Sequence, residues 1–184
     1  RPTQAQPLAD SVAAHTSVPY TLLFLTSPGD TDEYNACLAT GMNVLQVDAP
    51  ERGNYAAKIN AGYRLTNNAY LLLAADDLEF TPDWDINALA VAKASQKGVV
   101  GTNDMANKQV MRGEFSTHSL VSRKYIQEHG GSMDGPGVVY HEGYDHNYVD
   151  RELCALAMAR DEWAVAIESR VVHKRPPPDD TYRK

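Results

Sequence analysis

The chain of 184 residues is 43% hydrophobic and 22% charged, and this length and composition predict one globular domain with a sizeable buried core. Its formal net charge of −7 argues against a general affinity for nucleic acid or for an anionic membrane surface. The sequence shows two cysteines without zinc-ligand spacing, no signal peptide and no apolar run that could span a membrane, which together predict a cytoplasmic protein.

The first 104 residues alternate between helical and strand-like patterns. Thr31 and Thr81 are predicted N-caps, and Pro82 suits a first helical position. Residues 69–75 show no polar alternation, which predicts a central strand buried on both faces. The expected helices are 8–15, 31–42, 54–66 and 81–96, and the expected strands are 20–30 with its closing turn, 43–50, 69–75 and 98–104. These alternating units predict an α/β fold, a mostly parallel central sheet with helices on both faces.

The second half of the chain has a different texture. After Asp104 the sequence is rich in glycine, histidine and polar residues, with a short helix expected at 122–129. A longer amphipathic helix is expected at 147–163 and a closing strand at 164–173. Residues 174–184 form a polar, proline-rich tail. We therefore divide the single domain into a first half, 1–104, an elaborated second half, 105–173, and this tail.

Two adjacent carboxylates, Asp76 and Asp77, follow the apolar strand at 69–75. Ligands of open α/β sheets bind beyond the carboxyl ends of the strands, where these two residues are expected. Neighbouring carboxylates repel each other when partly desolvated, so a cation is needed to keep both ionised. Magnesium or manganese, completed by the phosphates of a nucleotide diphosphate, meets that need. The alternative, that the pair caps the next helix or faces water, stays open on the pair alone.

The residues around this pair resemble the middle of family 2 glycosyltransferases and their relatives with the GT-A fold, including some small virus-encoded members. In that family a glycine- and asparagine-containing helix leads into an apolar strand, an acidic motif, a proline and an aromatic. Two later stretches, 118–134 and 149–154, resemble the family's Gly-Gly-Phe-Asp segment and its acidic Leu motif. The residues that match the first pattern are Gly53, Ala57, Asn60, Gly62, Asp76, Asp77, Pro82 and Trp84.

The resemblance implies a Rossmann-like, nucleotide-sugar-binding GT-A fold whose first strand is missing from this chain, because residues 1–15 resemble those that follow that strand. Residues 1–104 would then be the nucleotide-sugar-binding half and 105–173 the acceptor and catalytic half. The implied reaction moves a sugar from a nucleotide diphosphate sugar to an acceptor hydroxyl, with manganese or magnesium as cofactor.

The family's residue roles carry over to matching positions. Asp150 resembles the general base of inverting members, which takes the proton of the acceptor hydroxyl. Asp76, Asp77 and His173 resemble metal ligands. The positions implied to bind the nucleotide or its phosphates are Thr3, Ser27, Arg52, Lys58, Asp76, Lys174 and Arg175. Taken singly, Asp150 also fits a first-turn carboxylate favoured by the helix dipole, and His173 a buried histidine at a strand end.

The sequence departs from the family at Ala74 and Ala75, where an additional acid is expected. Two alternatives to a glycosyltransferase therefore stay open: a nucleotidyltransferase on the same fold, and a non-catalytic nucleotide-sugar-binding module. The expected acceptor is a protein, a glycan or a modified nucleobase, of which nucleic acid fits the net charge least well. A virus-encoded member would act in the host cytoplasm.

The stretch His141 to His146, "HEGYDH", is one residue too long for the zinc-protease motif. Two histidines five positions apart diverge by roughly 140° around a helix, and Gly143 weakens a helix further. We therefore assign this stretch, together with His118, to the acceptor side of the site rather than to zinc hydrolysis, and a solvated loop without a role stays open as the alternative.

Overall fold

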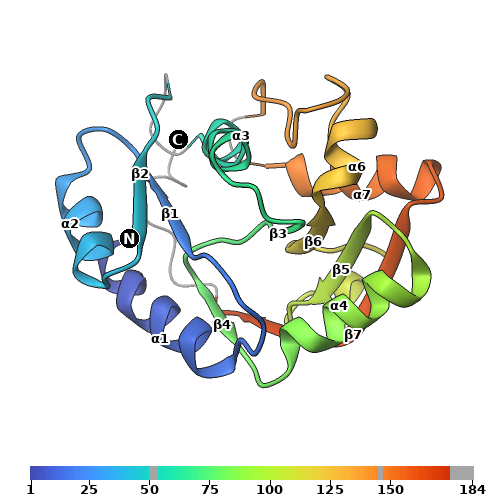
Figure 1. Ribbon diagram of the computed structural model, residues 1–184, viewed down its shortest axis with the longest axis horizontal. Helices are drawn as coiled ribbons and strands as arrows, with labels where there is room; N and C mark the ends of the chain where they lie inside the picture. Colours follow the sequence, from blue (N-terminus) through green and yellow to red (C-terminus); the bar gives the residue numbers. More distant parts are fainter. Residues whose placement is uncertain (50–53, 145–146, 175–184) are drawn as a thin grey trace.

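A computed structural model describes residues 1–49, 54–144 and 147–174 (Figure 1). The fold is mixed α/β and has two sheets, a parallel pair β1–β2 and a curled five-stranded sheet in the order β3-β6-β5-β7-β4. The strands are β1 Leu23–Thr26, β2 Asn43–Gln46, β3 Tyr70–Leu72, β4 Leu78–Phe80, β5 Val99–Asn103, β6 Ser119–Ser122 and β7 Trp163–His173. The helices are η1 Pro2–Gln4, α1 Ala5–His15, α2 Thr31–Ala39, α3 Tyr55–Leu65, α4 Trp84–Ser95, α5 Lys108–Met111, α6 Arg123–Glu128 and α7 Val149–Ala159.

The five-stranded sheet is mostly antiparallel, so the prediction of a mostly parallel sheet is wrong. Within it only β5 and β7 pair in parallel, while β6 runs antiparallel between β3 and β5, and β4 runs antiparallel to β7. The sequence pattern missed β4 and β6 because each is a short strand inside a segment with turn-forming or polar neighbours. Both owe their existence to pairing with strands distant in the chain, which local periodicity does not report.

Strand β3 is a second correction, because it is not a central strand. It pairs with β6 on one side, and in the described part of the chain no strand pairs with its other edge. Its three residues are accordingly only half-buried. The apolar run at 69–75 predicts a strand buried on both faces. In the part of the chain that the structure describes, one edge of β3 is instead unpaired and lies beside the separate β1–β2 sheet (Figure 1).

Two predicted helix caps also differ. Asp30, not Thr31, caps α2, where its carboxylate accepts a hydrogen bond from Glu33 N at 3.4 Å. Helix α4 begins at Trp84 rather than at Pro82, after Asp83 in the left-handed region with φ 62°. Thr81 is engaged elsewhere, because its hydroxyl donates to the carbonyl of Arg170 at 2.8 Å. Thr81 therefore holds β7 instead of starting a helix.

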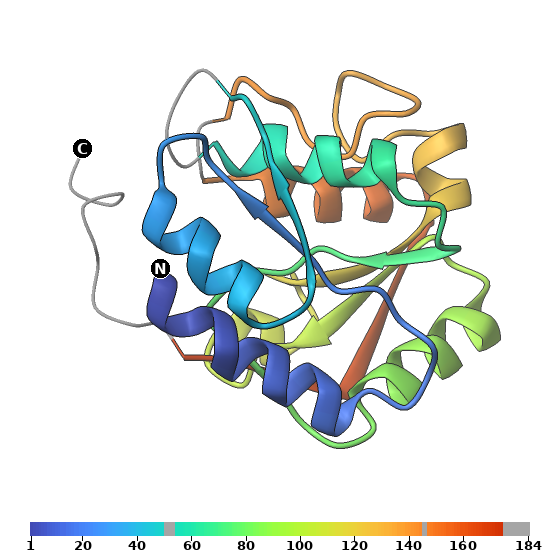
Figure 2. The same ribbon diagram turned by 60° about the vertical axis from the view of Figure 1, so that its left-hand side comes forward.

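Helices cover both faces of the sheet, as predicted. Alternate residues of β5 point to opposite sides, so Val99 packs in a core cluster with α3, α6 and α7, and Val100 packs in one with α4. A third cluster joins α1 to β1, β4 and the end of β7 through Phe24, Phe80 and Val171. In Figure 2, α3 and α7 lie above the sheet and α1 and α4 below it. No helix among the described residues has the length and apolar character needed to cross a membrane.

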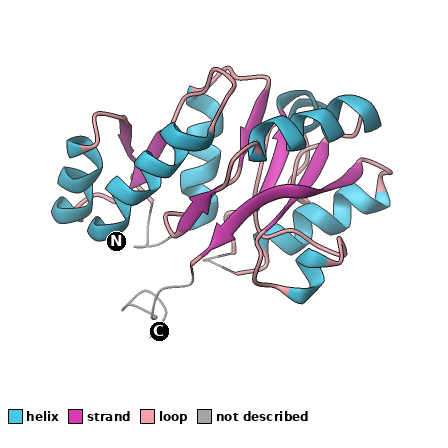
Figure 3. Cartoon of the chain, turned by 90° about the horizontal axis from the view of Figure 1, so that it is seen from below, coloured by secondary structure: helices cyan, strands magenta, loops and turns pink. Residues whose placement is uncertain are grey.

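Strand β7 links two parts of the sheet (Figure 3). Its first half pairs in parallel with β5, and its last three residues pair antiparallel with β4. The register with β5 shifts between Thr102 and Asn103, which marks the irregularity where β7 changes partner. The last residue of β7, His173, thereby lies opposite Leu78.

Candidate active site

Several strand ends meet at one edge of the five-stranded sheet. Strands β3, β5 and β7 run in the same direction, so their carboxyl ends lie at this edge together with the amino ends of the antiparallel strands β4 and β6. Four titratable residues lie at these ends: Asp77, Asp104, His118 and His173. We call them the strand-end cluster. Asp77 and His173 are the predicted site residues among them.

Asp77 and His173 contact each other directly. Asp77 is 3% exposed, and its Oδ2 lies 3.2 Å from His173 Nε2. The β4–β7 pairing places the two residues, and Lys174 N donates to the carbonyl of Asp77 at 2.9 Å. Burial alone would raise the pKa of Asp77, but the hydrogen bond and charge of His173, with the charge of Arg1, outweigh it and lower this pKa to about 2. Asp77 is therefore ionised at neutral pH although it is buried.

The lowered pKa of Asp77 predicts a loss of stability in acid. A carboxylate whose pKa is lower in the folded state stabilises the fold above its ordinary value of 3.8, and this contribution disappears as the pH falls towards 2. The shift corresponds to roughly 2 kcal/mol of unfolding free energy. Urea unfolding between pH 6 and pH 2 is expected to show that Asp77→Asn, less stable than wild type at pH 6, approaches it at pH 2. Asp161→Asn, at an exposed side chain, serves as the control, and a difference for Asp77→Asn that did not change with pH would contradict this prediction.

Asp76 pairs with Arg1, which also reaches Asp77. The Arg1 guanidinium binds its carboxylate through two nitrogens, with Nε donating to Oδ2 at 2.8 Å and Nη2 contacting Oδ1, and the same Nη2 lies 3.3 Å from Asp77 Oδ2. The adjacent carboxylates of Asp76 and Asp77 need a positive charge nearby to stay ionised together. In this structure the Arg1 guanidinium supplies that positive charge, which the residue pattern around Asp76 did not reveal.

His118, which the sequence analysis assigns to the acceptor side, lies in the cluster beside the predicted metal ligands. It is 5% exposed and precedes β6, with Nδ1 3.4 Å from the carbonyl oxygen of Leu73 and its ring edge-on to His173 at 5.2 Å between centroids. Burial, and secondly the charge of His173, lower the pKa of His118 to about 4, so its imidazole is neutral at neutral pH. The signal that places His118 beside the site is the antiparallel strand "SLVS", which directly follows it.

Asp104 ends β5 and has a structural role. Its Oδ1 accepts hydrogen bonds from the backbone nitrogens of Ala106 and Asn107 at 3.0 and 2.8 Å, and its Oδ2 accepts one from Thr117 Oγ1 at 3.1 Å. Its carbonyl also accepts from His173 N at 3.1 Å. Asp104 therefore holds the turn after β5 and the last residue of β7 in place.

Asp150 is the second residue of α7, which begins directly after Tyr148, a residue with the left-handed φ of 75°. Its Oδ1 accepts a hydrogen bond from Arg151 N at 2.9 Å. Asp150 and Asp77 both act on the Tyr55 side chain, because burial raises the pKa of Tyr55 and the charges of these two carboxylates raise it further. Tyr55 in turn donates from its hydroxyl to the carbonyl of Ala74 at 3.1 Å. The charges of the two predicted carboxylates, one on α7 and one directly before β4, thus act on the same buried side chain.

Asn60, one of the residues in the family-like helix, fixes the loop that lies between the cluster and α7. Its Oδ1 accepts from Val139 N at 2.9 Å and Tyr140 N at 3.1 Å, and its Nδ2 donates to the Tyr140 carbonyl at 2.8 Å. The same Nδ2 donates to Glu142 Oε1 at 3.0 Å. Asn60 is 2% exposed, and its three bonds to the backbone are buried, whereas the bond to the exposed Glu142 is only partly buried.

Asn60→Ala is expected to lower the free energy of unfolding by roughly 2–4 kcal/mol, because it leaves buried backbone groups of Val139 and Tyr140 without hydrogen bonds. Urea unfolding measured by circular dichroism gives this value. Asn87→Ala is the matched control, since that amide makes one bond, to the Glu168 carbonyl, in an exposed setting. If Asn60→Ala cost no more than Asn87→Ala, the role given to Asn60 would be wrong.

The structure does not bring the other predicted nucleotide-binding residues into one group. Ser27 is buried after β1, Thr3 is exposed in η1, and Lys58 is half-buried in α3. The Lys174 side chain pairs with Glu79 at 2.8 Å. Arg52 and Arg175 lie outside the described residues. Asp76, Asp77 and His173 are therefore the predicted ligand residues that the fold places together.

The donor set can be tested against a divalent metal. Within 1–49, 54–144 and 147–174, no three His, Cys, Asp or Glu side chains form a group that could hold a metal ion. Asp77 nevertheless has one buried oxygen, Oδ1, without a hydrogen-bond partner among the described residues. One carboxylate oxygen suits magnesium or manganese when the substrate's phosphates and water supply the other ligands. The residues thus fit a metal that arrives with a phosphate-bearing ligand.

The "HEGYDH" stretch does not approach this arrangement in the part that is described. His141 Nδ1 lies 2.9 Å from Asp134 Oδ2, so its partner is a carboxylate of the same loop. His146 lies outside the described residues.

In a search against known proteins, no family model and no curated protein matches this sequence.

Proposed function

We propose that this chain is a GT-A-type glycosyltransferase domain, which transfers a sugar from a nucleotide diphosphate sugar to an acceptor hydroxyl with inversion. The observation that carries the proposal is Asp77, a buried carboxylate that His173 contacts and whose Oδ1 has no hydrogen-bond partner among the described residues, together with Asp150 in the first turn of α7. A transferase of this kind needs one carboxylate beside the departing diphosphate and another beside the attacking hydroxyl. The two acids come from different elements and from positions that the family resemblance had assigned to these two tasks.

Asp77 is the residue that would hold a magnesium or manganese ion, through Oδ1. Such an ion neutralises the charge that grows on the diphosphate as it leaves. His173 keeps the carboxylate oriented and ionised through its contact with Oδ2. The Arg1 guanidinium, held by Asp76, adds a second positive charge at the same place.

Asp150 would act on the acceptor. As a general base it accepts the proton of the attacking hydroxyl while the bond between the sugar and the diphosphate breaks. The N-terminus of α7 favours the ionised carboxylate, which is the form that accepts a proton. The loop that Asn60 anchors precedes α7 in the chain, so we assign acceptor binding to this loop.

A non-catalytic nucleotide-sugar-binding module is the second candidate. It is favoured by one observation, that Asp76 is already paired with Arg1 and leaves a single carboxylate oxygen for a metal. Ala74 and Ala75 provide no further acid. Turnover distinguishes the two functions, because a binding module would bind the donor and leave it intact.

The test is a titration of the protein with a panel of nucleotide sugars, each in manganese, magnesium or chelator, followed by an assay for released nucleotide diphosphate. The proposal expects one donor to bind more tightly with metal than with chelator and to be slowly hydrolysed in the absence of acceptor. Binding without any release over long incubation would favour the binding module. Absence of binding by every donor with metal present would contradict both.

A further inference from the structure

Several hydrogen bonds hold the backbone of His118 in place. Its carbonyl oxygen accepts hydrogen bonds from Thr102 N at 3.3 Å and from Ser116 Oγ at 2.8 Å, and Thr102 Oγ1 donates to the same oxygen. Ser116 and Thr102 are themselves buried and bonded to each other. The imidazole is therefore presented from a fixed backbone into the strand-end cluster, as a preorganised binding group would be.

Three atoms of the cluster are buried and have no hydrogen-bond partner within the described ranges: His118 Nε2, His173 Nδ1 and Asp77 Oδ1. His118 Nδ1 faces the carbonyl of Leu73, which places the proton of this neutral ring on Nδ1 and leaves a lone pair on Nε2. Leaving a buried acceptor such as His118 Nε2 unmet costs free energy, so this nitrogen points to a ligand that supplies a donor.

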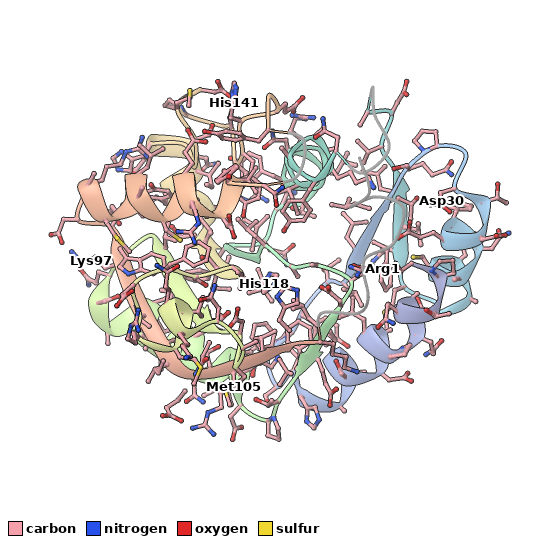
Figure 4. All side chains as sticks on the ribbon, turned by 180° about the vertical axis from the view of Figure 1, so that it is seen from behind. Arg1, Asp30, Lys97, Met105, His118 and His141 are labelled. Carbon is pink, nitrogen blue, oxygen red and sulfur yellow. The ribbon has the colours of Figure 1, made fainter. Side chains whose placement is uncertain are left out.

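Three residues of the cluster form a row of contacts with Arg1, and the charge changes along this row. The row runs from the Arg1 guanidinium through Asp77 and His173 to the neutral imidazole of His118. Figure 4 shows His118 near the middle of the molecule and Arg1 to its right. A phosphate group, which brings acceptors and negative charge, suits the Arg1 end. A hydroxyl group, which can donate, suits the His118 end.

We propose that His118 Nε2 accepts a hydrogen bond from a hydroxyl of the donor's sugar ring, so that the sugar lies over the start of β6 and the diphosphate lies towards Asp77 and Arg1. This inference rests on the proposed function and adds to it the direction in which the donor lies. It makes His118 a residue that distinguishes a nucleotide sugar from the bare nucleotide.

The test compares two ligands on three proteins. Wild type, His118→Phe and His129→Phe are titrated by calorimetry with a nucleoside diphosphate and with the matching nucleotide sugar, in manganese, using the pair that wild type binds best. Phenylalanine keeps the ring and its edge contact but has no lone pair. We expect His118→Phe to weaken the nucleotide sugar by roughly three- to tenfold and to leave the nucleoside diphosphate unchanged. His129 is exposed and packs on Tyr125, outside the cluster, so His129→Phe is expected to change neither affinity.

Equal losses for both ligands, or no loss for either, would overturn the role of His118 while leaving the proposed function intact. Failure of wild type to bind any nucleotide of the panel would overturn the proposed function, and the role of His118 with it. Thermal unfolding checks that each variant is folded. If His118→Phe is not, His118→Leu carries the same comparison with the same expected selective loss.

Discussion

Asp150→Asn is expected to lower the turnover number for sugar transfer by roughly 10²- to 10⁴-fold while donor affinity stays unchanged, because a general base contributes about this much to the rate. The amide is nearly the same size as the carboxylate but accepts no proton from the acceptor hydroxyl. Single-turnover assays with a saturating donor measure the effect. Nuclear magnetic resonance of the product should show an inverted anomeric centre, and a retained centre would exclude this mechanism.

Glu152→Gln is the matched control for Asp150→Asn. Glu152 lies in the same first turn of α7, and its Oε1 accepts from Met133 N at 2.8 Å. If Asp150 only interacted with the helix dipole, both variants would keep their activity and lose a few tenths of a kcal/mol of stability. Full activity of Asp150→Asn would therefore assign it to the helix terminus and not to the reaction.

Asp77→Asn is expected to remove most of the metal-dependent part of donor binding, a loss of roughly 10- to 100-fold or more in affinity. Even residues that only support a metal ligand change metal affinity by about that factor, and Asp77 is the proposed ligand itself. The measurement is the ratio of donor affinities in manganese and in chelator, which should approach one in the variant.

Asp76→Asn separates the two neighbouring carboxylates. It disrupts the contact with Arg1 and leaves the contact between Asp77 and His173 in place. We expect it to retain metal dependence, since the oxygen proposed to hold the metal belongs to Asp77. Loss of metal dependence in Asp76→Asn with retention in Asp77→Asn would reverse the assignment of the two residues.

The sequence predicted those parts of the fold that depend on local patterns. The helices α1, α3 and α7 follow from apolar residues at helical spacing, and the caps were misplaced by a few residues only. Strands β4 and β6 were missed because three or four residues carry little periodicity, and their pairing partners lie far along the chain. Because β4 and β6 were missed, the predicted directions of the strands in the sheet are wrong.

The site residues also divide into those that local patterns predict and those that depend on contacts between distant segments. Asp77, Asp150 and His173 are identified from their neighbours in sequence, and the fold brings Asp77 and His173 into contact. Arg1 as the partner of Asp76, and His118 as a neighbour of His173, depend on contacts between segments that no local pattern connects. Both are consequences of strand register and of where the first helix docks.

The change of partner along β7 also affects when the site can form. The residue that fixes Asp77 is the last residue of the last strand, and the contact between them spans 96 positions of the chain. During synthesis the helices and the β1–β2 pair can form early, but β4 and the strand-end cluster must wait for β7 to emerge and dock. Closure of such a long loop late in folding is slow compared with helix formation. Under the proposed function, a nascent chain that has not yet released β7 should therefore not bind a donor.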